Sequence, residues 1–219
     1  MTISAENIVE IQRILSEPRF ATYLQNCNGS RENACNLYQW NLKLSSAFIV
    51  PLHLIEVSIR NAAVECIEKV HTSNWPWTEG FIRRLPNPKK GYNPTRNLKE
   101  VARMHNPTMG KVVAELKFVF WEKMFTARYD DALWNKHIRI VFPNAPVEMT
   151  PAQIREEIHM DISEIRKLRN RIAHHEPIFL RGNRDDYDRI YKLLNWRSKA
   201  VAEWMSEIQT VTGLILERP

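Results

Sequence analysis

Apolar residues recur every three or four positions along most of the chain, and this period predicts helices. Ser4 is expected to cap a first helix that stops before Pro18, and a short helix follows to about Leu24. Two long helical pieces are expected from Arg31. The second begins around Pro51, where the proline ring requires a kink or a break. The pattern predicts an all-α fold.

The segment from His71 to Thr95 has no sustained period and is rich in proline, so we expect a long irregular connection around residues 71–95. Trp75, Trp77 and Tyr92 lie there among arginines and lysines. Aromatic rings beside cations suit single-stranded nucleic acid. A loop of this length also needs aromatic anchors on the domain, and anchoring is the favoured interpretation.

Two further helices frame the second half of the chain. Thr108 is expected to cap a central, buried helix over residues 109–125, because its apolar residues occupy every face. A closing helix is expected at about residues 186–215, with Asp185 or Asp186 as its cap.

The clearest helix is predicted at about residues 151–175. Its isoleucines and leucines repeat at intervals of three and four, which is typical of a half-buried helix. Pro177 disfavours the α conformation in the residue before it, so the helix should end near His174 or His175. A capping box with proline in the first turn marks its start, formed by Thr150, Pro151 and Gln153.

Asp161 falls inside the apolar stripe of this helix, which is unusual for a carboxylate. We therefore expect a charged partner, an arginine from a neighbouring helix. The closing helix is the neighbour that we expect to pack against the helix of Asp161, because the loop between the two is short.

The composition fits one soluble globular domain over residues 1–219, with 44% hydrophobic and 26% charged residues. The formal net charge of +6 favours polyanions as partners without proving nucleic-acid binding. Few glycines are present and the common nucleotide-binding loops are absent, so no cofactor is expected.

Three widely spaced cysteines, with no C-x-x-C pair, are typical of reduced structural thiols in a cytoplasm. The first residues lack the apolar core of a signal peptide. We expect no apolar run to approach the roughly 20 residues that span a bilayer. We therefore expect a cytoplasmic protein without a membrane partner.

The stretch "KLRNRIAHHEPIF", residues 167–179, gathers the polar side chains that could do chemistry. No serine or cysteine nucleophile has a readable place beside its histidines, and their spacing is not that of metal ligands, so no metal is expected. Arginine and histidine suit a phosphodiester: guanidinium neutralises charge on the phosphate oxygens, and imidazole moves a proton. On RNA the 2′-hydroxyl can serve as nucleophile. The side chains concerned are Arg169, Asn170, Arg171, His174 and His175.

On an ideal helix, Arg169 and His174 would diverge by about 140°. Pro177 distorts the last turn, and a histidine on that turn can swing back toward the arginine. We therefore expect Arg169 and His174 to converge.

The pattern R-N-x-x-x-H from Arg169 to His174 resembles the R-x4-6-H signature of the HEPN superfamily. Wider stretches resemble the Abi-like family of bacterial phage-resistance proteins within that group. They occur in the family's order and span most of the chain. These stretches are "LYQWNLKLSSAF" (37–48), "PLHLIEVSIRNA" (51–62), "GKVVAELKFVFW" (110–121) and "LRNRIAHHEPIF" (168–179).

This resemblance implies a multi-helix HEPN-like bundle that dimerises, so that two signature ends face one another across a composite cleft. The catalytic places fall on Arg169, Asn170 and His174. His175 is an alternative to His174, since the signature also allows five intervening residues. Glu56 and Arg60 can instead form only an intrahelical ion pair. The side chains expected around the cleft are Glu56, Arg60, Asn61, Arg171 and His175.

The leading hypothesis is a metal-independent endoribonuclease of the abortive-infection or toxin type, which cuts single-stranded RNA by 2′-hydroxyl attack. RNA, a second copy of the chain and an antitoxin or regulatory protein are its expected partners. The alternative is a non-catalytic helical domain of a phage-defence system that binds RNA or a partner protein. In a third, purely structural hypothesis, Arg169 and His175 only cap the helix and bind its carbonyls.

Overall fold

The computed structural model describes residues 4–219, and these residues form helices and connections without any strand. The predicted all-α fold is confirmed. The helices are α1 Ala5–Leu15, α2 Glu17–Asn26, α3 Arg31–Ala47, α4 Ile49–His71, α5 Glu79–Ile82, α6 Pro94–Ala102, α7 Met109–Glu115, α8 Phe118–Met124, α9 Asn135–Val141, α10 Pro151–Ala173, α11 Asn183–Arg197, α12 Lys199–Ile208 and α13 Val211–Leu216.

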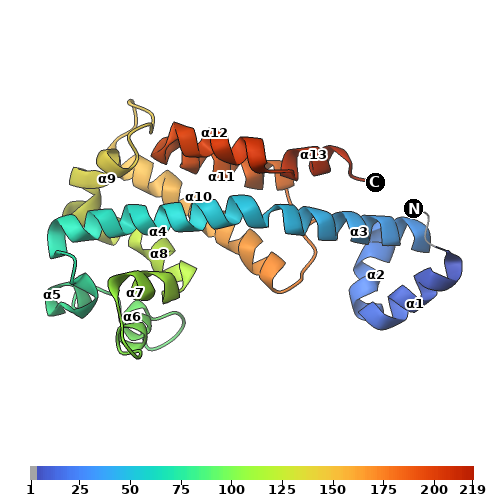
Figure 1. The fold of residues 1–219 in the computed structure, drawn as a ribbon, viewed down its shortest axis with the longest axis horizontal. Coiled ribbons are helices and arrows are strands. Elements are labelled where there is room, and N and C mark those ends of the chain that lie inside the picture. Colours follow the sequence, from blue (N-terminus) through green and yellow to red (C-terminus); the bar gives the residue numbers. More distant parts are fainter. Residues whose placement is uncertain (1–3) are drawn as a thin grey trace.

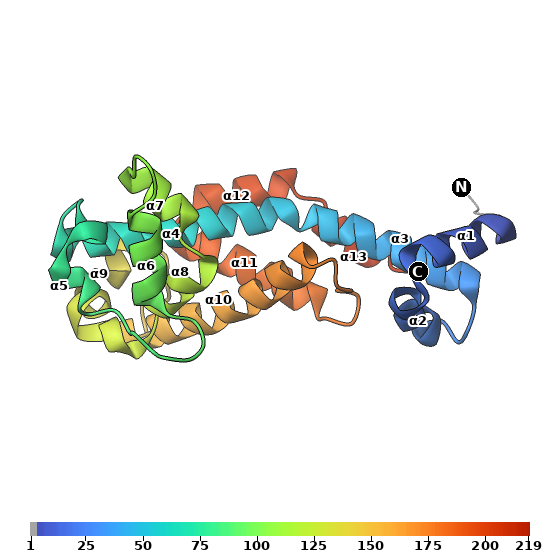
Figure 2. The ribbon, with the colours of Figure 1, turned by 90° about the horizontal axis from the view of Figure 1, so that it is seen from below.

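Helices α3 and α4 lie end to end and form a rod along the whole molecule (Figure 1). Helix α11 packs against α4, α10 and α12, and the short helices α5 to α8 gather around one end of the rod. Helices α1 and α2 lie at the other end, near the C-terminus (Figure 2). The end of α10 and the loop after it lie between these two groups.

The break in the rod lies where the proline requires it. Helix α3 ends at Ala47, and Pro51 falls in the first turn of α4, where a missing N–H leaves no helical bond unmade. The N–H of Leu52 donates to the carbonyl of Phe48 at 3.0 Å, so the two helices remain joined. The predicted break near Pro51 is confirmed.

The joined helix Arg31–His71 also holds an apolar window, with mean hydropathy 1.5, that is long enough to cross a membrane. A core helix of a soluble protein passes the same test, so this is weak evidence for a membrane span. One face of the helix carries fully buried residues such as Ile55 and Ile59, which pack in the core.

The connection over residues 71–95 is less irregular than expected, because it contains a 3₁₀ turn at Trp75–Trp77 and helix α5. Trp75 is fully buried, with its ring 4.8 Å from that of Phe81, and so cannot stack on a base. The indole N–H of Trp77 donates to the carbonyl of Ala102 at 3.1 Å. Both tryptophans anchor the segment, which confirms the favoured interpretation for these two residues.

The central helix predicted over residues 109–125 is in fact two helices, α7 and α8. Leu116 is extended between them, and the side-chain oxygen of Asn97 accepts the N–H of Lys117 at 3.4 Å and the hydroxyl of Tyr92 at 2.8 Å. Asn97 belongs to α6, a helix that the sequence pattern did not indicate. A partner from outside the helix therefore takes the N–H that a continuous helix would have used.

The single closing helix predicted at residues 186–215 is also wrong, because α11, α12 and α13 follow one another there. The hydroxyl of Ser198 accepts the N–H of Val201 and starts α12 as a new helix. Neither Asp185 nor Asp186 is the N-cap of α11. Asp186 is instead buried and accepts two hydrogen bonds from Arg181, both at 2.8 Å.

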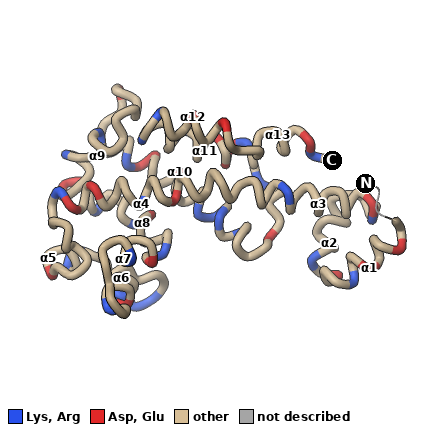
Figure 3. The backbone as a smooth tube through the Cα atoms, viewed as in Figure 1, with Lys and Arg blue, Asp and Glu red and all other residues tan. Residues whose placement is uncertain are grey.

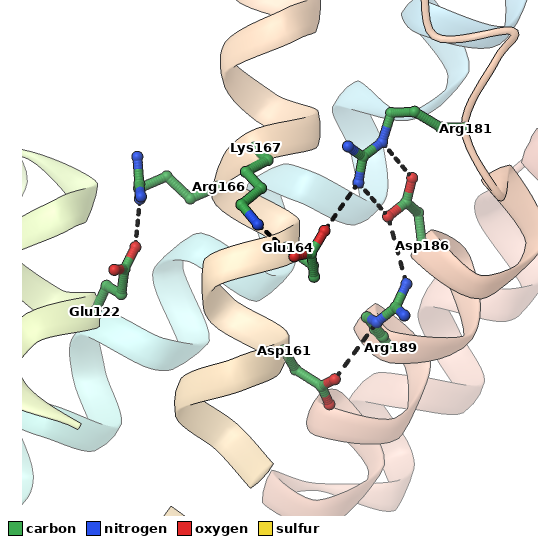
Figure 4. A network of polar contacts seen from close by, with 8 residues as sticks. All are labelled: Glu122, Asp161, Glu164, Arg166, Lys167, Arg181, Asp186 and Arg189. Carbon is green, nitrogen blue, oxygen red and sulfur yellow. Dashed lines mark hydrogen bonds and ion pairs between the residues drawn. The ribbon is translucent and has the colours of Figure 1, made fainter. Parts of the chain in front are cut away.

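Helix α10 begins at the predicted capping box and ends at the predicted turn, with His174 as its C-cap. It packs against α11, as expected. Asp161 is buried and has an arginine partner from that helix, Arg189, at 3.6 Å. Lys192, also on α11, lies nearer, at 2.8 Å. A chain of ion pairs from Lys167 and Glu164 through Arg181, Asp186 and Arg189 to Asp161 joins the two helices (Figure 4).

A buried amide fixes the loop that leaves α10. Asn41, on α3, is 4% exposed, and its side-chain oxygen accepts the N–H groups of Ile178 and Phe179 at 2.8 and 3.2 Å. Buried N–H groups outside a helix need such an acceptor, because water cannot reach them. Asn41 therefore ties the end of α10 to the rod.

We expect Asn41→Ala to lower the free energy of unfolding by about 2–4 kcal/mol, because two buried N–H groups lose their acceptor. Urea denaturation of this variant and of Asn36→Ala, an exposed asparagine on the same helix, measures the effect. A loss no larger than that of the Asn36 variant would contradict the structural role.

Burial raises the pKa of Asp161 above its usual 3.8, although hydrogen bonding to Lys192 and the charge of Arg189 act in the opposite direction. The folded state therefore holds the proton more tightly than the unfolded state. The stability of the wild type relative to Asp161→Asn should fall as pH rises through and above about 3.8. Urea denaturation of both proteins between pH 3 and pH 6 tests this, and a stability difference that is constant with pH would refute it.

Candidate functional site

The C-terminal turn of α10 closes with a Schellman motif. The N–H of Glu176 donates to the carbonyl of Arg171 at 2.7 Å, and that of His175 donates to the carbonyl of Ile172 at 3.0 Å. His175 adopts φ of 57°, the left-handed conformation that this position requires. Histidine is among the non-glycine residues that tolerate it. The backbone of His175 therefore has a structural task.

Two arginines hold this turn in place. The Nε of Arg171 donates to the carbonyl of Pro177 at 3.0 Å, and its guanidinium lies 3.7 Å from the carboxylate of Glu176. Arg19, on α2, donates to the carbonyl of His175 at 2.6 Å. In the purely structural hypothesis, Arg169 and His175 capped the helix; in the structure, Arg171 and Arg19 bind the carbonyls of the loop.

Arg169 faces α4 instead of the loop. Its Nε lies 3.8 Å from Oε2 of Glu56, whose other oxygen accepts a hydrogen bond from Arg60. The second terminal nitrogen of Arg60 donates to the carbonyl of Ala114 at 3.1 Å. The fold thus brings Glu56 and Arg60 beside Arg169, although they are far apart in sequence.

These three side chains differ in how free they are. The side chains of Glu56 and Arg60 are 17% and 18% exposed, whereas that of Arg169 is 46% exposed. The predicted intrahelical ion pair of Glu56 and Arg60 is present, and Glu56 also sits against Arg169. Arg60 is committed to protein partners, so Arg169 is the arginine of this group that can meet a ligand.

The other candidate residues are placed differently. Asn61 is exposed, and on a helix it points about 100° away from Arg60. His174 is exposed at the end of α10, and its backbone N–H donates to the carbonyl of Asn170 at 2.9 Å. The convergence of Arg169 and His174 stays a prediction.

A pocket of about 360 Å³ opens beside Arg169, on the side of α8. Arg166 turns toward α8, away from the ion-pair chain on the other face of α10, and pairs there with the buried carboxylate of Glu122 (Figure 4). The C-terminal part of α10 carries several basic residues (Figure 3). The pocket is lined by Lys117, Phe118, Val119, Arg166, Arg169 and Asn170.

Sequence reasoning missed two of these cations, Lys117 and Arg166. Arg166 could have been found, because it precedes Arg169 by three residues and therefore shares its helix face. Lys117 carries no such signal, since only the turn between α7 and α8 places it there. The residues that the structure describes contain no group of three or more His, Cys, Asp or Glu arranged as metal ligands.

The arrangement has a definite chemical capacity. A half-exposed guanidinium and an amide can bind an oxyanion, with hydrogen bonds strengthened by charge. The exposed imidazole of His174 lies five residues beyond Arg169, and imidazole is the side chain that most often transfers protons in catalysis. The end of α10 thus presents groups of the kind that can act on a phosphodiester.

We expect His175→Gly to keep or raise stability by up to about 1 kcal/mol, because glycine adopts φ of 57° at no steric cost. His175→Val should lower it by about 1–2 kcal/mol, since a branched Cβ is strained there. Urea denaturation compares the two variants. Equal losses in both would mean that contacts of the imidazole, and not the backbone, decide the effect.

Comparisons of this chain with known proteins leave its family open. No family model, no curated protein and no solved structure matches it.

Proposed function

We propose that the protein is a metal-independent endoribonuclease that cuts single-stranded RNA. The 2′-hydroxyl of the RNA attacks the adjacent phosphorus, and the bond to the 5′-oxygen of the next nucleotide breaks, which leaves a 2′,3′-cyclic phosphate. Arg169 stabilises the charge that builds on the phosphate oxygens. His174 transfers the proton, and Asn170 orients the phosphate or the imidazole.

The observation that carries this proposal is the environment of Arg169. Its side chain is 46% exposed, and its Nε lies 3.8 Å from Glu56, the one carboxylate that pairs with it among the described residues. Arg60 and Arg171, in contrast, donate to protein carbonyls. A structural arginine donates to protein acceptors, as those two do. Arg169 keeps donors for a ligand one turn before an exposed histidine.

The resemblance to the Abi-like family extends the proposal to an HEPN-like bundle, a homodimer with a composite cleft and a role in phage defence in the cytoplasm. An antitoxin or a regulatory protein would then restrain the activity. The exposed face of His174 fits a cleft that a second copy completes, because an isolated histidine in solvent has no second wall against which to hold a substrate.

A second candidate function is RNA or partner binding without cleavage. The exposure of His174 also favours binding without cleavage, since a solvated imidazole beside cations can bind phosphate without transferring a proton. The two functions differ in whether RNA is cut.

Labelled single-stranded RNA, incubated with the wild type in EDTA, should be cut. His174→Ala and Arg169→Ala should each reduce the rate by at least about 100-fold, because each removes a group that acts in the transition state. His175→Gly is the matched control and should keep the activity. All variants are first checked for the wild-type melting curve.

The outcomes separate the hypotheses. Binding of RNA without any cleavage by the wild type supports the binding domain and refutes the nuclease. Loss of activity in His175→Gly but not in His174→Ala would move the acid–base role to His175. If the cleft is composite, a mixture of the Arg169 and His174 variants should recover part of the activity, provided that each contributes a different residue to one site.

A further inference from the structure

The pocket beside Arg169 contains cations that the proposed reaction does not use. Lys117 reaches it from the turn between α7 and α8, and Arg166 reaches it from α10. No acidic side chain lines this pocket. Its lining therefore suits an anion, and the size of about 360 Å³ leaves room for more than a single small ion.

The position of the pocket relative to the histidine shows that it is a separate binding place. Arg166 precedes Arg169 by three residues, about 4.5 Å along the axis, whereas His174 follows Arg169 by five residues, about 7.5 Å in the opposite direction. Arg169 and Asn170 thus line the end of the pocket nearer to His174, and Arg166 lies farther from it. A phosphate in the pocket and a phosphate at His174 would be different groups.

The cations of the pocket are held in different ways. Arg166 is 27% exposed and is fixed by the buried carboxylate of Glu122, which turns its guanidinium toward α8. Lys117 is exposed and pairs with no carboxylate among the described residues. A fixed guanidinium gives the pocket its geometry, and a free ammonium supplies charge that a ligand can neutralise.

We propose that the pocket of Lys117, Arg166, Arg169 and Asn170 binds the phosphate of the RNA nucleotide next to the one that is cut. This inference rests on the proposed function, because it takes the cut phosphate to lie between Arg169 and His174. The neighbouring phosphate fixes the register of the strand, and Arg169 contacts both phosphates.

The test uses Lys117, because its exposed side chain can be changed without disturbing a buried charge. Loss of Arg166 would instead leave the buried carboxylate of Glu122 with Lys123 as its remaining ion-pair partner. Binding of labelled single-stranded RNA is measured by fluorescence anisotropy in the His174→Ala background, which prevents cleavage, over a series of salt concentrations. Lys117→Ala should raise Kd roughly three- to tenfold and reduce the slope of log K against log salt by about 0.7, the value for one phosphate contact on a single strand.

Two controls make the result specific. Lys117→Arg keeps the charge and should keep both Kd and slope near those of the parent. Lys136→Ala removes an exposed lysine of α9 outside the pocket and should leave the slope unchanged. In the cleavage assay with His174 present, Lys117→Ala should raise KM more than it lowers kcat, as loss of a contact made equally in ground and transition states does.

The outcomes distinguish this inference from the proposed function. Cleavage by the wild type together with identical slopes for the Lys117 and Lys136 variants overturns the pocket and leaves the nuclease standing. A Lys117-dependent slope without cleavage supports the pocket and overturns the nuclease. An absence of RNA binding by the wild type overturns both.

Discussion

The end of α10 depends on one side chain from a distant helix. The amide of Asn41 accepts two N–H groups from the chain after α10, and so binds the loop to the rod of α3 and α4. Without this acceptor, the N–H groups of Ile178 and Phe179 would be buried without a hydrogen-bond partner. The chain that follows the Schellman turn and His174 is thereby held against the rod.

The two faces of α10 are then held by charge. On one face, Glu164, Asp161 and their partners link the helix to α11, and on the other, Arg166 reaches the buried carboxylate of Glu122 on α8 (Figure 4). A helix held on both sides cannot roll about its axis without separating ion pairs on one of them. The direction in which Arg169 points is therefore determined by ion pairs on both sides of the helix.

The sequence predicted what depends on local rules. The start of α10 follows from Thr150 and Gln153, and its end follows from Pro177, because capping and proline sterics act within a few residues. The break before α8 could not be predicted in this way, because the side chain of Asn97 finds the N–H of Lys117 only after the chain has folded. The division of the closing helix does follow a local rule, the cap that Ser198 provides for α12, but the continuous apolar period hides it.

The same division applies to the candidate site. Arg169, Asn170 and His174 lie within six consecutive residues and are evident in the sequence, and the carboxylate of Asp161 pointed to its arginine partner. Lys117 reaches the site only through tertiary packing, and the left-handed backbone of His175 emerges only from the hydrogen bonds of the turn. A sequence motif thus indicates which residues are candidates for a site, while the fold determines which of its members have a structural role.

The carboxylate of Glu56 beside Arg169 changes how strongly Arg169 attracts different anions. In the absence of ligand, part of the guanidinium charge is already neutralised, so the site attracts simple salt ions less than a bare arginine would. A chain of phosphates, which offers several charges at once, outweighs one carboxylate where a lone chloride does not. Glu56 can thereby make anion binding at Arg169 depend on how many negative charges the ligand carries close together.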